Sequence, residues 1–204
     1  MNLTQKIIGS HLVSGTMTPG SEIGLRIDQT LTQDATGTMA WLQFEALGIP
    51  RVKTDISLSY VDHNTLQMNF RNPDDHRFLR TVAAKFGGVY SGPGTGICHQ
   101  LHLENFAKPG ATLVGSDSHT RYGALGTLGV GEGGGEIVKQ LLRNTYDLAA
   151  PQVILVHVTG RPRHGVGPHD VAIALCGAVY KNGFVKNKVL EFVGDGIGRL
   201  SMDY

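Results

Sequence analysis

Residues 54–62 (TDISLSYVD) predict a strand, and residues 72–87 (NPDDHRFLRTVAAKFG) predict the helix that follows it. Pro73 and Asp74 suit the first turn of this helix, where the backbone N–H has no partner and negative charge is favoured. Gly87 suits the C-terminal cap, because glycine readily adopts the left-handed conformation found there. A strand that passes through a short loop into a helix is the unit from which α/β folds are built.

The same alternation of strand and helix continues along the chain. Further strands are expected at residues 89–90, 111–117, 151–160 and 188–196, and further helices at residues 39–48, 97–107, 136–143 and 169–183. The apolar run PQVILVHVTG at residues 151–160 is typical of a parallel strand that is covered on both faces. We therefore predict one three-layer α/β/α region over residues 1–204, with a mostly parallel sheet.

The composition predicts a soluble globular protein and argues against several classes of function. Of the 204 residues, 41% are hydrophobic and 17% are charged, and the net charge is +1. Such a balance does not favour binding to nucleic acid or to an anionic membrane, and no apolar run approaches the roughly 18 residues of a membrane span. Cys98 and Cys176 stand far apart, so we expect no disulfide and a cytoplasmic, reducing location.

Three short histidine motifs fall at or near the ends of predicted strands. They are residues 62–64 (DHN), residues 98–100 (CHQ) and residues 117–120 (DSHT), and glycine-rich loops lie between them. In a parallel sheet, the carboxyl ends of the strands meet at one edge, where ligands bind. A carboxylate beside a histidine orients the ring and raises its pKa, which suits proton transfer. The three motifs together predict a polar active site.

Each motif also has a plain structural interpretation. Residues 62–63 read as a capping carboxylate beside a surface histidine, residues 99–100 as hydrogen-bonded polar residues of a helix, and residues 117–118 as a helix N-cap. Cys98 is not favoured as a nucleophile, because no orienting group follows from the sequence. The remaining histidines are expected to be structural or on the surface, with one of them, three residues after His99, also open to a supporting role in the site. They are His11, His76, His102, His157, His164 and His169.

Four stretches resemble the N-terminal region of the aconitase family. They are DQTLTQDATGTMAWLQFEALG at residues 28–48, YVDHN at residues 60–64, GTGICHQLHLENFAKPG at residues 94–110 and GSDSHT at residues 115–120. The resemblance covers nearly the whole chain, and the order of the motifs makes it specific. It implies a fold like the N-terminal α/β/α domain of that family.

The resemblance also implies an activity. Enzymes of this family are hydro-lyases that remove and re-add water on a hydroxy-polycarboxylate, with a [4Fe-4S] cluster as Lewis acid. Asp62 and His63 match the family's acid–base pair, and His99 matches a histidine near the water bound to the cluster. Asp117 and His119 match the pair that hydrogen-bonds that water and the leaving hydroxyl.

Two further residues match positions that bind the substrate's carboxylates, namely Gln43 and Ser118. The chain departs from the family pattern at Arg121 and at Glu132, a cation and an acid expected near the pocket, so the preferred hydroxy acid stays open.

The cluster ligands are the larger departure. Cys98 and Cys176 do not match the family's cysteine positions, and two thiols cannot supply the usual ligand set. We therefore expect the cluster in the full-length protein, with ligands outside this chain and no metal ligand within it. The chain alone is expected to be inactive and to need the remaining domains or a partner subunit.

Two other functions stay open on the sequence. One is a binding module that keeps a polycarboxylate pocket without catalysis. The other is a mononuclear metal hydrolase that uses His63, Asp117 and His119, which are reasonable ligands for zinc or manganese.

Overall fold

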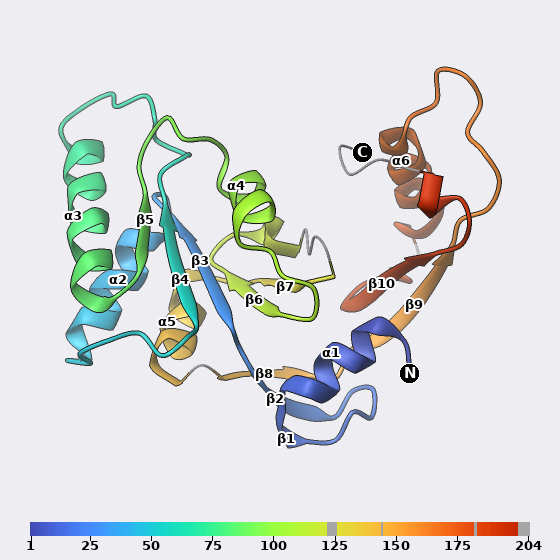
Figure 1. Cartoon of the computed structure of the whole chain (residues 1–204), viewed down its shortest axis with the longest axis horizontal. Helices are drawn as coiled ribbons and strands as arrows, with labels where there is room; N and C mark the ends of the chain where they lie inside the picture. Colours follow the sequence, from blue (N-terminus) through green and yellow to red (C-terminus); the bar gives the residue numbers. More distant parts are fainter. Residues whose placement is uncertain (122–125, 144, 182, 200–204) are drawn as a thin grey trace.

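The computed structural model describes residues 1–121, 126–143, 145–181 and 183–199, and a parallel sheet forms its centre. The order of the strands in this sheet is β5-β4-β3-β6-β7 (Figure 1). These strands are β3 (Gln29–Gln33), β4 (Ile56–Tyr60), β5 (Val89–Ser91), β6 (Thr112–Gly115) and β7 (Leu128–Gly131). Every neighbouring pair is parallel, so all five carboxyl ends lie at one edge.

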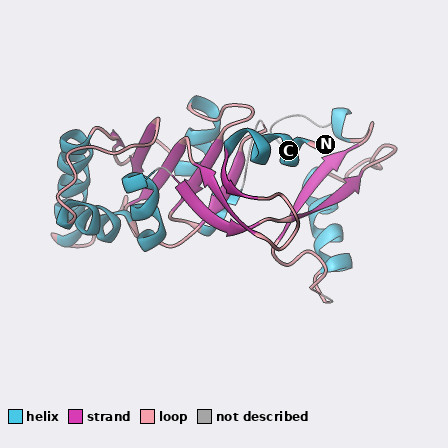
Figure 2. Cartoon of the chain, turned by 90° about the horizontal axis from the view of Figure 1, so that it is seen from below, coloured by secondary structure: helices cyan, strands magenta, loops and turns pink. Residues whose placement is uncertain are grey.

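Helices cover both faces of this sheet (Figure 2). The first face carries α2 (Gly37–Ala46), α3 (Arg71–Phe86) and α5 (Gly134–Arg143), whose apolar side chains form one core with Val61 and Val114. The second face carries α4 (Cys98–Asn105), which packs on Leu31, Leu58 and Leu113. The three-layer α/β/α fold predicted from the sequence is confirmed.

The helix α3 ends as its sequence predicts. Gly87 has φ 81°, in the left-handed region, and its N–H donates to the carbonyl of Ala83. Leu79, Val82, Ala83 and Phe86 are buried on one face. The aromatic ring of Phe86 stacks on that of Trp41 in α2, with 6.4 Å between the ring centroids. This contact packs α3 against α2.

The sequence pattern did not identify the central strand β3. Its sequence, QTLTQ, carries four polar residues, yet all five residues are buried. Internal hydrogen bonds satisfy several of the polar side chains: Thr30 donates to Ser57, Thr32 to the carbonyl of Leu58, and Gln29 to the carbonyl of Phe106. A strand of this kind lacks the apolar run that marks a buried parallel strand.

A smaller antiparallel sheet adjoins the large one. It consists of β1 (Leu12–Gly15), β2 (Glu22–Arg26) and β8 (Thr145–Ala149), and α1 (Leu3–His11) precedes it. The sequence pattern did not identify α1, β1, β2 and β8, nor β7 of the large sheet. His11 at the end of α1 is buried, and its Nε2 lies 2.8 Å from the Asp28 carboxylate. It is therefore structural, one of the two roles expected for the histidines outside the three motifs.

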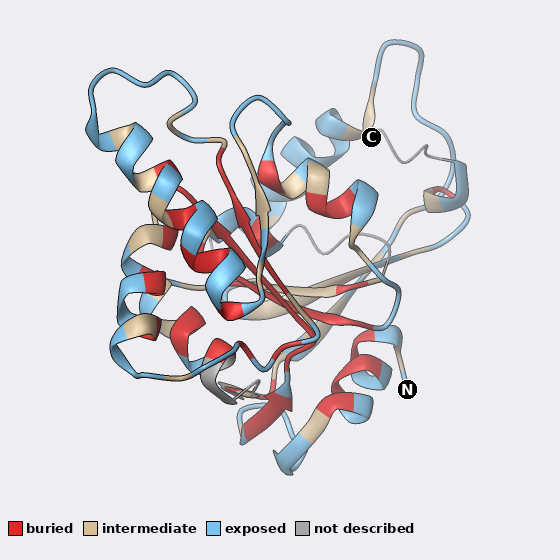
Figure 3. Cartoon of the chain, turned by 60° about the vertical axis from the view of Figure 1, so that its left-hand side comes forward, coloured by how far each residue is buried: buried red, intermediate tan, exposed pale blue. Residues whose placement is uncertain are grey.

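The last described elements form a strand–helix–strand unit. They are β9 (Gln152–His157), α6 (Pro168–Val179) and β10 (Lys188–Val193), followed by the short 3-10 helix η2 (Ile197–Arg199). β9 and β10 pair in parallel, as expected. The expectation that β9 is covered on both faces is wrong for this chain: Leu155 is 61% exposed, and α6 has no buried residue (Figure 3). No helix in the described part of the chain has the length and apolar character needed to cross a membrane.

Candidate active site

The carboxyl edge of the large sheet brings five of the seven expected site residues together. Asp62 and His63 follow β4 after one intervening residue, and Asp117 follows β6 after one intervening residue. His119 lies in the short 3-10 helix η1 (Ser118–Arg121), and His99 is in the first turn of α4. Residues far apart in sequence therefore meet because their strands are neighbours or next neighbours in a parallel sheet.

The carboxylate of Asp117 is the centre of this cluster. Its Oδ1 lies 3.1 Å from His99 Nε2 and 2.9 Å from His119 Nδ1, and it accepts the backbone N–H of His119 at 2.7 Å. Its Oδ2 lies 3.8 Å from His63 Nε2. Burial alone would raise the pKa of Asp117, but the hydrogen bonds from His119 and His99 outweigh it and bring the pKa to about 2. Asp117 is thus ionised at neutral pH.

An ionised Asp117 fixes the protons of its neighbours. A carboxylate can only accept, so the ring nitrogens of His99 and His119 that face it carry their protons. The His119 side chain is 80% exposed, whereas that of His99 is 16% exposed. His119 therefore presents the other nitrogen of an oriented ring to whatever occupies the site.

Asp62 and His63 form a second pair at the same edge. Asp62 Oδ1 lies 2.7 Å from His63 Nδ1, and its Oδ2 accepts the N–H of Cys98 at 2.7 Å. Partial burial would lower the pKa of His63, but the hydrogen bond and charge of Asp62, with the charges of Asp34 and Asp117, raise it above the ordinary value. Asp62 thus orients His63 and caps the helix that carries His99.

A third carboxylate, Asp34, belongs to this edge and was not singled out from the sequence. It follows β3 directly, and its side chain is 1% exposed. Its oxygens accept the backbone N–H groups of Asp62, His63 and Asn64 and the side-chain amide of Asn64. Its position after the central strand was the available signal, but the polar sequence of β3 concealed that strand.

The two residues expected to bind carboxylates are placed differently. Ser118 is exposed at the start of η1, next to Asp117. Gln43 is exposed on α2, beside Gly135 of α5. The hydrogen bonds of the described residues do not connect Gln43 with the cluster around Asp117.

Neither cysteine has the character of a cluster ligand. Cys98 is buried, and burial together with the nearby Asp62 carboxylate raises the pKa of its thiol well above the usual range. Cys176 is exposed on α6, in the separate strand–helix–strand unit. The thiols present do not fit a [4Fe-4S] cluster, which takes several thiolates around one centre. The high thiol pKa also removes Cys98 as a nucleophile at neutral pH.

Among the residues that the structure describes, two groups of side chains have the atom types that bind metal ions. They are Asp34, Asp62 and His63, and His99, Asp117 and His119, each with ligand atoms within 4.8 Å of one another. In both groups, the central carboxylate already accepts hydrogen bonds from protein N–H groups. These internal bonds account for the geometry without an ion.

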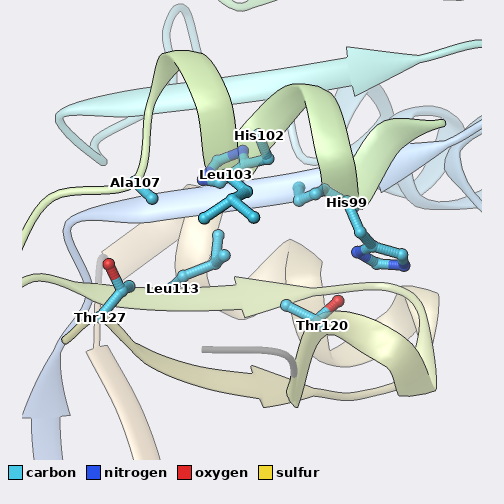
Figure 4. Close-up of a pocket in the computed structure, with 8 residues that line it drawn as sticks. His99, His102, Leu103, Ala107, Leu113, Thr120 and Thr127 are labelled. Atoms are coloured by element: carbon cyan, nitrogen blue, oxygen red, sulfur yellow. The ribbon is translucent and has the colours of Figure 1, made fainter. Parts of the chain in front are cut away.

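A small pocket lies behind the cluster, between α4 and β6 (Figure 4). It shares only His99 with the cluster, and its other lining residues are Leu31, His102, Leu103, Ala107, Leu113, Thr120 and Thr127. His102 is buried, with Nε2 2.8 Å from Gln29 Oε1 and Nδ1 3.2 Å from the hydroxyl of Tyr60. Burial, with the charge of His99, lowers its pKa to about 4. His102 is therefore a neutral core residue beneath the site.

Arg121 and Glu132 lie at the same sheet edge. Arg121 is exposed at the end of η1, and one guanidinium nitrogen lies 3.5 Å from the carbonyl of Gly131. Glu132 follows β7 and accepts a hydrogen bond from the hydroxyl of Tyr146. The acid is thus occupied by an internal partner, while the cation faces solvent.

Comparison with known proteins agrees with this architecture. The family model described as "Aconitase family (aconitate hydratase)" matches residues 5–204. The mitochondrial aconitate hydratase of Candida albicans is 37% identical over 193 residues, which are 89% of this chain and 24% of that protein. That of Schizosaccharomyces pombe is 34% identical over 216 residues, or 98% of this chain and 27% of that protein. The mitochondrial homocitrate dehydratase of Saccharomyces cerevisiae is 31% identical over 222 residues, or 98% and 28%.

These names correct one prediction. The sequence predicted a cytoplasmic location, whereas these similar proteins are named as mitochondrial enzymes. The prediction rested on two unpaired cysteines, and free thiols report only redox conditions, which do not identify a compartment.

The chain spans about a quarter of the length of the curated relatives it matches. Within that quarter, the motifs, the parallel sheet and the match over residues 5–204 agree. The chain belongs to the aconitase family.

Proposed function

We propose that this chain forms the acid–base half of a hydro-lyase site that adds and removes water on a hydroxy-polycarboxylate. The observation that carries the proposal is the convergence of His63, His99 and His119 on the ionised carboxylate of Asp117. Dehydration requires a base that takes a proton from carbon and an acid that protonates the leaving hydroxyl. Oriented imidazoles beside a carboxylate supply both kinds of group.

The roles follow from exposure and contacts. His119, oriented by Asp117 and mostly exposed, is assigned the proton donor for the leaving hydroxyl. His63, which is hydrogen-bonded to Asp62, is assigned to the other proton transfer, the removal of a proton from carbon. His99 shares the Asp117 oxygen and is assigned a hydrogen bond to the reacting water. Ser118 and Gln43 are each assigned to a carboxylate of the substrate.

The support for an anionic substrate comes from one cation and from the names of the relatives, because carboxylates outnumber Lys and Arg side chains at this edge. Residues 34–36, 61–70, 92–97, 116–127 and 132–133, which follow the five parallel strands, contain a single cation of the Lys/Arg type, Arg121. The relatives are named for aconitate and homocitrate, both polycarboxylates. We assign Arg121 to a substrate carboxylate at the rim of the site.

The expected cofactor lies outside this chain. A [4Fe-4S] cluster, when bound, supplies a Lewis acid for the substrate hydroxyl. Because Cys98 and Cys176 do not fit it, we infer that thiolates beyond residues 1–204 hold the cluster, and that the chain needs that further region for activity.

The test is to compare His119→Asn with His164→Asn in the longest native polypeptide that contains this chain. Both histidines are exposed, but His164 lies in the loop before α6. With hydroxy-polycarboxylates as substrates and the unsaturated product followed by absorbance, His119→Asn should lower kcat by about 10²- to 10⁴-fold, the usual contribution of general acid–base catalysis. His164→Asn should leave kcat unchanged. Equal activity of the two variants would remove His119 as the acid.

A further inference from the structure

We propose that Asp34 is a positioning residue of this site: its buried carboxylate holds the backbone of residues 62–64 in the conformation that turns His63 toward Asp117. The inference rests on the function proposed above, because the purpose of the arrangement is the placement of His63.

The hydrogen bonds that the Asp34 carboxylate accepts come from one turn of the chain, residues 62–64. Oδ1 accepts the N–H of Asp62 at 3.0 Å and of His63 at 2.9 Å. Oδ2 accepts the N–H and the side-chain amide of Asn64, both at 2.8 Å. One carboxylate thus satisfies three consecutive backbone N–H groups, and each oxygen accepts two donors.

These N–H groups would otherwise have no partner in a helix or sheet. The ladder of β4 ends with the N–H of Val61, which donates to the carbonyl of Ser91, and α3 begins only at Arg71. The residues between them follow no regular structure that would fix their φ and ψ angles. A buried carboxylate bonded to three consecutive N–H groups supplies that constraint, and hydrogen bonds to a charged group are among the stronger ones.

The backbone turn at residues 62–64 also determines where two candidate catalytic histidines lie, His63 and His99. Asp62, whose N–H is held by Asp34, bonds the His63 ring with Oδ1 and the N-terminus of α4 with Oδ2. The α4 helix carries His99. A displaced turn would therefore move His63 directly and would release the cap of the helix that places His99.

The surroundings of Asp34 keep it in place. The carboxylate is buried, and His76 of α3, also buried, lies with Nε2 3.7 Å from Oδ2. Burial by itself would raise the pKa of Asp34, but the N–H donors of His63, Asp62 and Asn64 outweigh it, so the pKa lies below the ordinary value. The Asp34 carboxylate is therefore ionised, and the hydrogen bonds from its four N–H donors offset the cost of burying its charge.

Asp34→Asn tests the proposal with little change of volume. Because each oxygen accepts two N–H groups, either orientation of the new amide sets its NH₂ group against two donors. We expect amide hydrogen exchange at two or more of residues 62–64 to accelerate about tenfold to a hundredfold, the range expected for losing hydrogen bonds to a charged group. The matched control is Asp55→Asn, an exposed carboxylate at the opposite end of β4.

The exchange pattern decides between positioning and general stabilisation. Acceleration limited to residues 62–64, with β3 and β4 unchanged, supports positioning. Acceleration throughout the sheet, or none at all, overturns it. The unsubstituted chain gives an independent result if Asp34→Asn does not fold: amides of residues 62–64 that exchange at the unprotected rate also overturn it.

Activity separates this inference from the proposed function. In the longest native polypeptide, Asp34→Asn should lower kcat with little change of KM, because it misplaces a reacting group without removing a substrate contact. If that polypeptide has no hydratase activity, the proposed function fails while the exchange result still stands. If it is active and Asp34→Asn retains full kcat, the positioning role fails and the function stands.

Discussion

At the scale of single residues, the proposed function depends on histidine rings whose protons are fixed by neighbouring carboxylates. His63 is the clearest case, because Asp62 bonds its Nδ1 while Asp34 and Asp117 add negative charge around it. A raised pKa means that the folded state binds the proton more tightly than the unfolded chain. The stability gained from the Asp62–His63 pair is therefore fully present below the ordinary pKa of 6.5 and is lost as the pH rises through the folded value.

Removing the Asp62 charge should reverse this shift. In the 204-residue chain, we expect the His63 ring to titrate above 6.5 and Asp62→Asn to lower its midpoint, as followed by NMR of the ring carbons. Glu104→Gln, an exposed carboxylate at the far end of α4, should leave the midpoint unchanged. A His63 midpoint that is the same in Asp62→Asn and in the unsubstituted chain would show that Asp62 does not control this proton.

At the scale of elements, glycines set how closely the strand ends approach one another. A Cβ on Gly131, the last residue of β7, would lie 2.4 Å from the backbone carbonyl oxygen of Asp117. That oxygen belongs to the turn that carries the central carboxylate of the site, and backbone cannot move aside as a flexible side chain can. Two residues later, a Cβ on Gly133 would meet no atom within 4 Å.

Gly131→Ala should therefore destabilise the fold, and Gly133→Ala should not. We expect Gly131→Ala to lower the free energy of unfolding by about 1–3 kcal/mol, the usual cost of overpacking, as measured by denaturant titration. Gly133→Ala should change it by less than about 0.5 kcal/mol. Similar values for the two variants would mean that the turn at Asp117 leaves room for a Cβ at Gly131.

A carboxylate also joins the first helix to the last strand. Glu191 of β10 accepts the N–H groups of Leu3 and Thr4 and the Thr4 hydroxyl at the N-terminus of α1. Partial burial would raise the pKa of Glu191, but these hydrogen bonds lower it below the ordinary value of 4.5. The contribution to stability is therefore present above 4.5 and is lost as the pH falls through the folded value.

An acid titration of amide chemical shifts should detect this contact. The amides of Leu3 and Thr4 should shift with a midpoint below 4.5, and Glu191→Gln should abolish that step. Asp195→Asn, which removes a carboxylate just beyond β10, should leave the step intact. Persistence of the step in Glu191→Gln would assign it to another acid.

At the scale of the whole molecule, the core is unevenly distributed. Every buried side chain among the described residues lies between Thr4 and Ala150, whereas residues 151–199 expose Leu155, Ile173 and Phe192. Two parallel strands and one helix without a buried side chain do not form an independent core. Such exposed apolar surface also favours association between copies.

A chain that ends at residue 150 should keep its cooperative fold. We expect residues 1–150 to unfold in one transition, with a Tm within about 4 °C of that of the 204-residue chain, a shift equivalent to about 1 kcal/mol. Residues 151–204 alone should show no cooperative transition by circular dichroism. Loss of cooperative unfolding in residues 1–150 would mean that the strand–helix–strand unit contributes to the core after all.

The sequence by itself determined the alternation of elements and most of the site. Hydrophobic period and helix-end residues identified β4, α3 and α6, because these signals are local and act within a few residues. The three histidine motifs at strand ends predicted the edge at which Asp62, His99 and Asp117 meet. The resemblance carried by those motifs named the family to which the chain belongs.

Only the tertiary structure decided the position of β3 in the sheet and the place of Asp34 in the site, because local sequence signals do not include contacts between distant residues. The strand β3 is polar in sequence and central in space, and partners from β4, from α4 and from the C-cap of α4 satisfy its side chains. Asp34 belongs to the site because it follows that strand and so lies beside residues 62–64. Gln43 of α2 has its side-chain amide oxygen beside Gly135 of α5, a neighbour 92 residues away in sequence. Burial and hydrogen bonding are properties of residues that meet across the fold, so a sequence read along the chain does not reveal them.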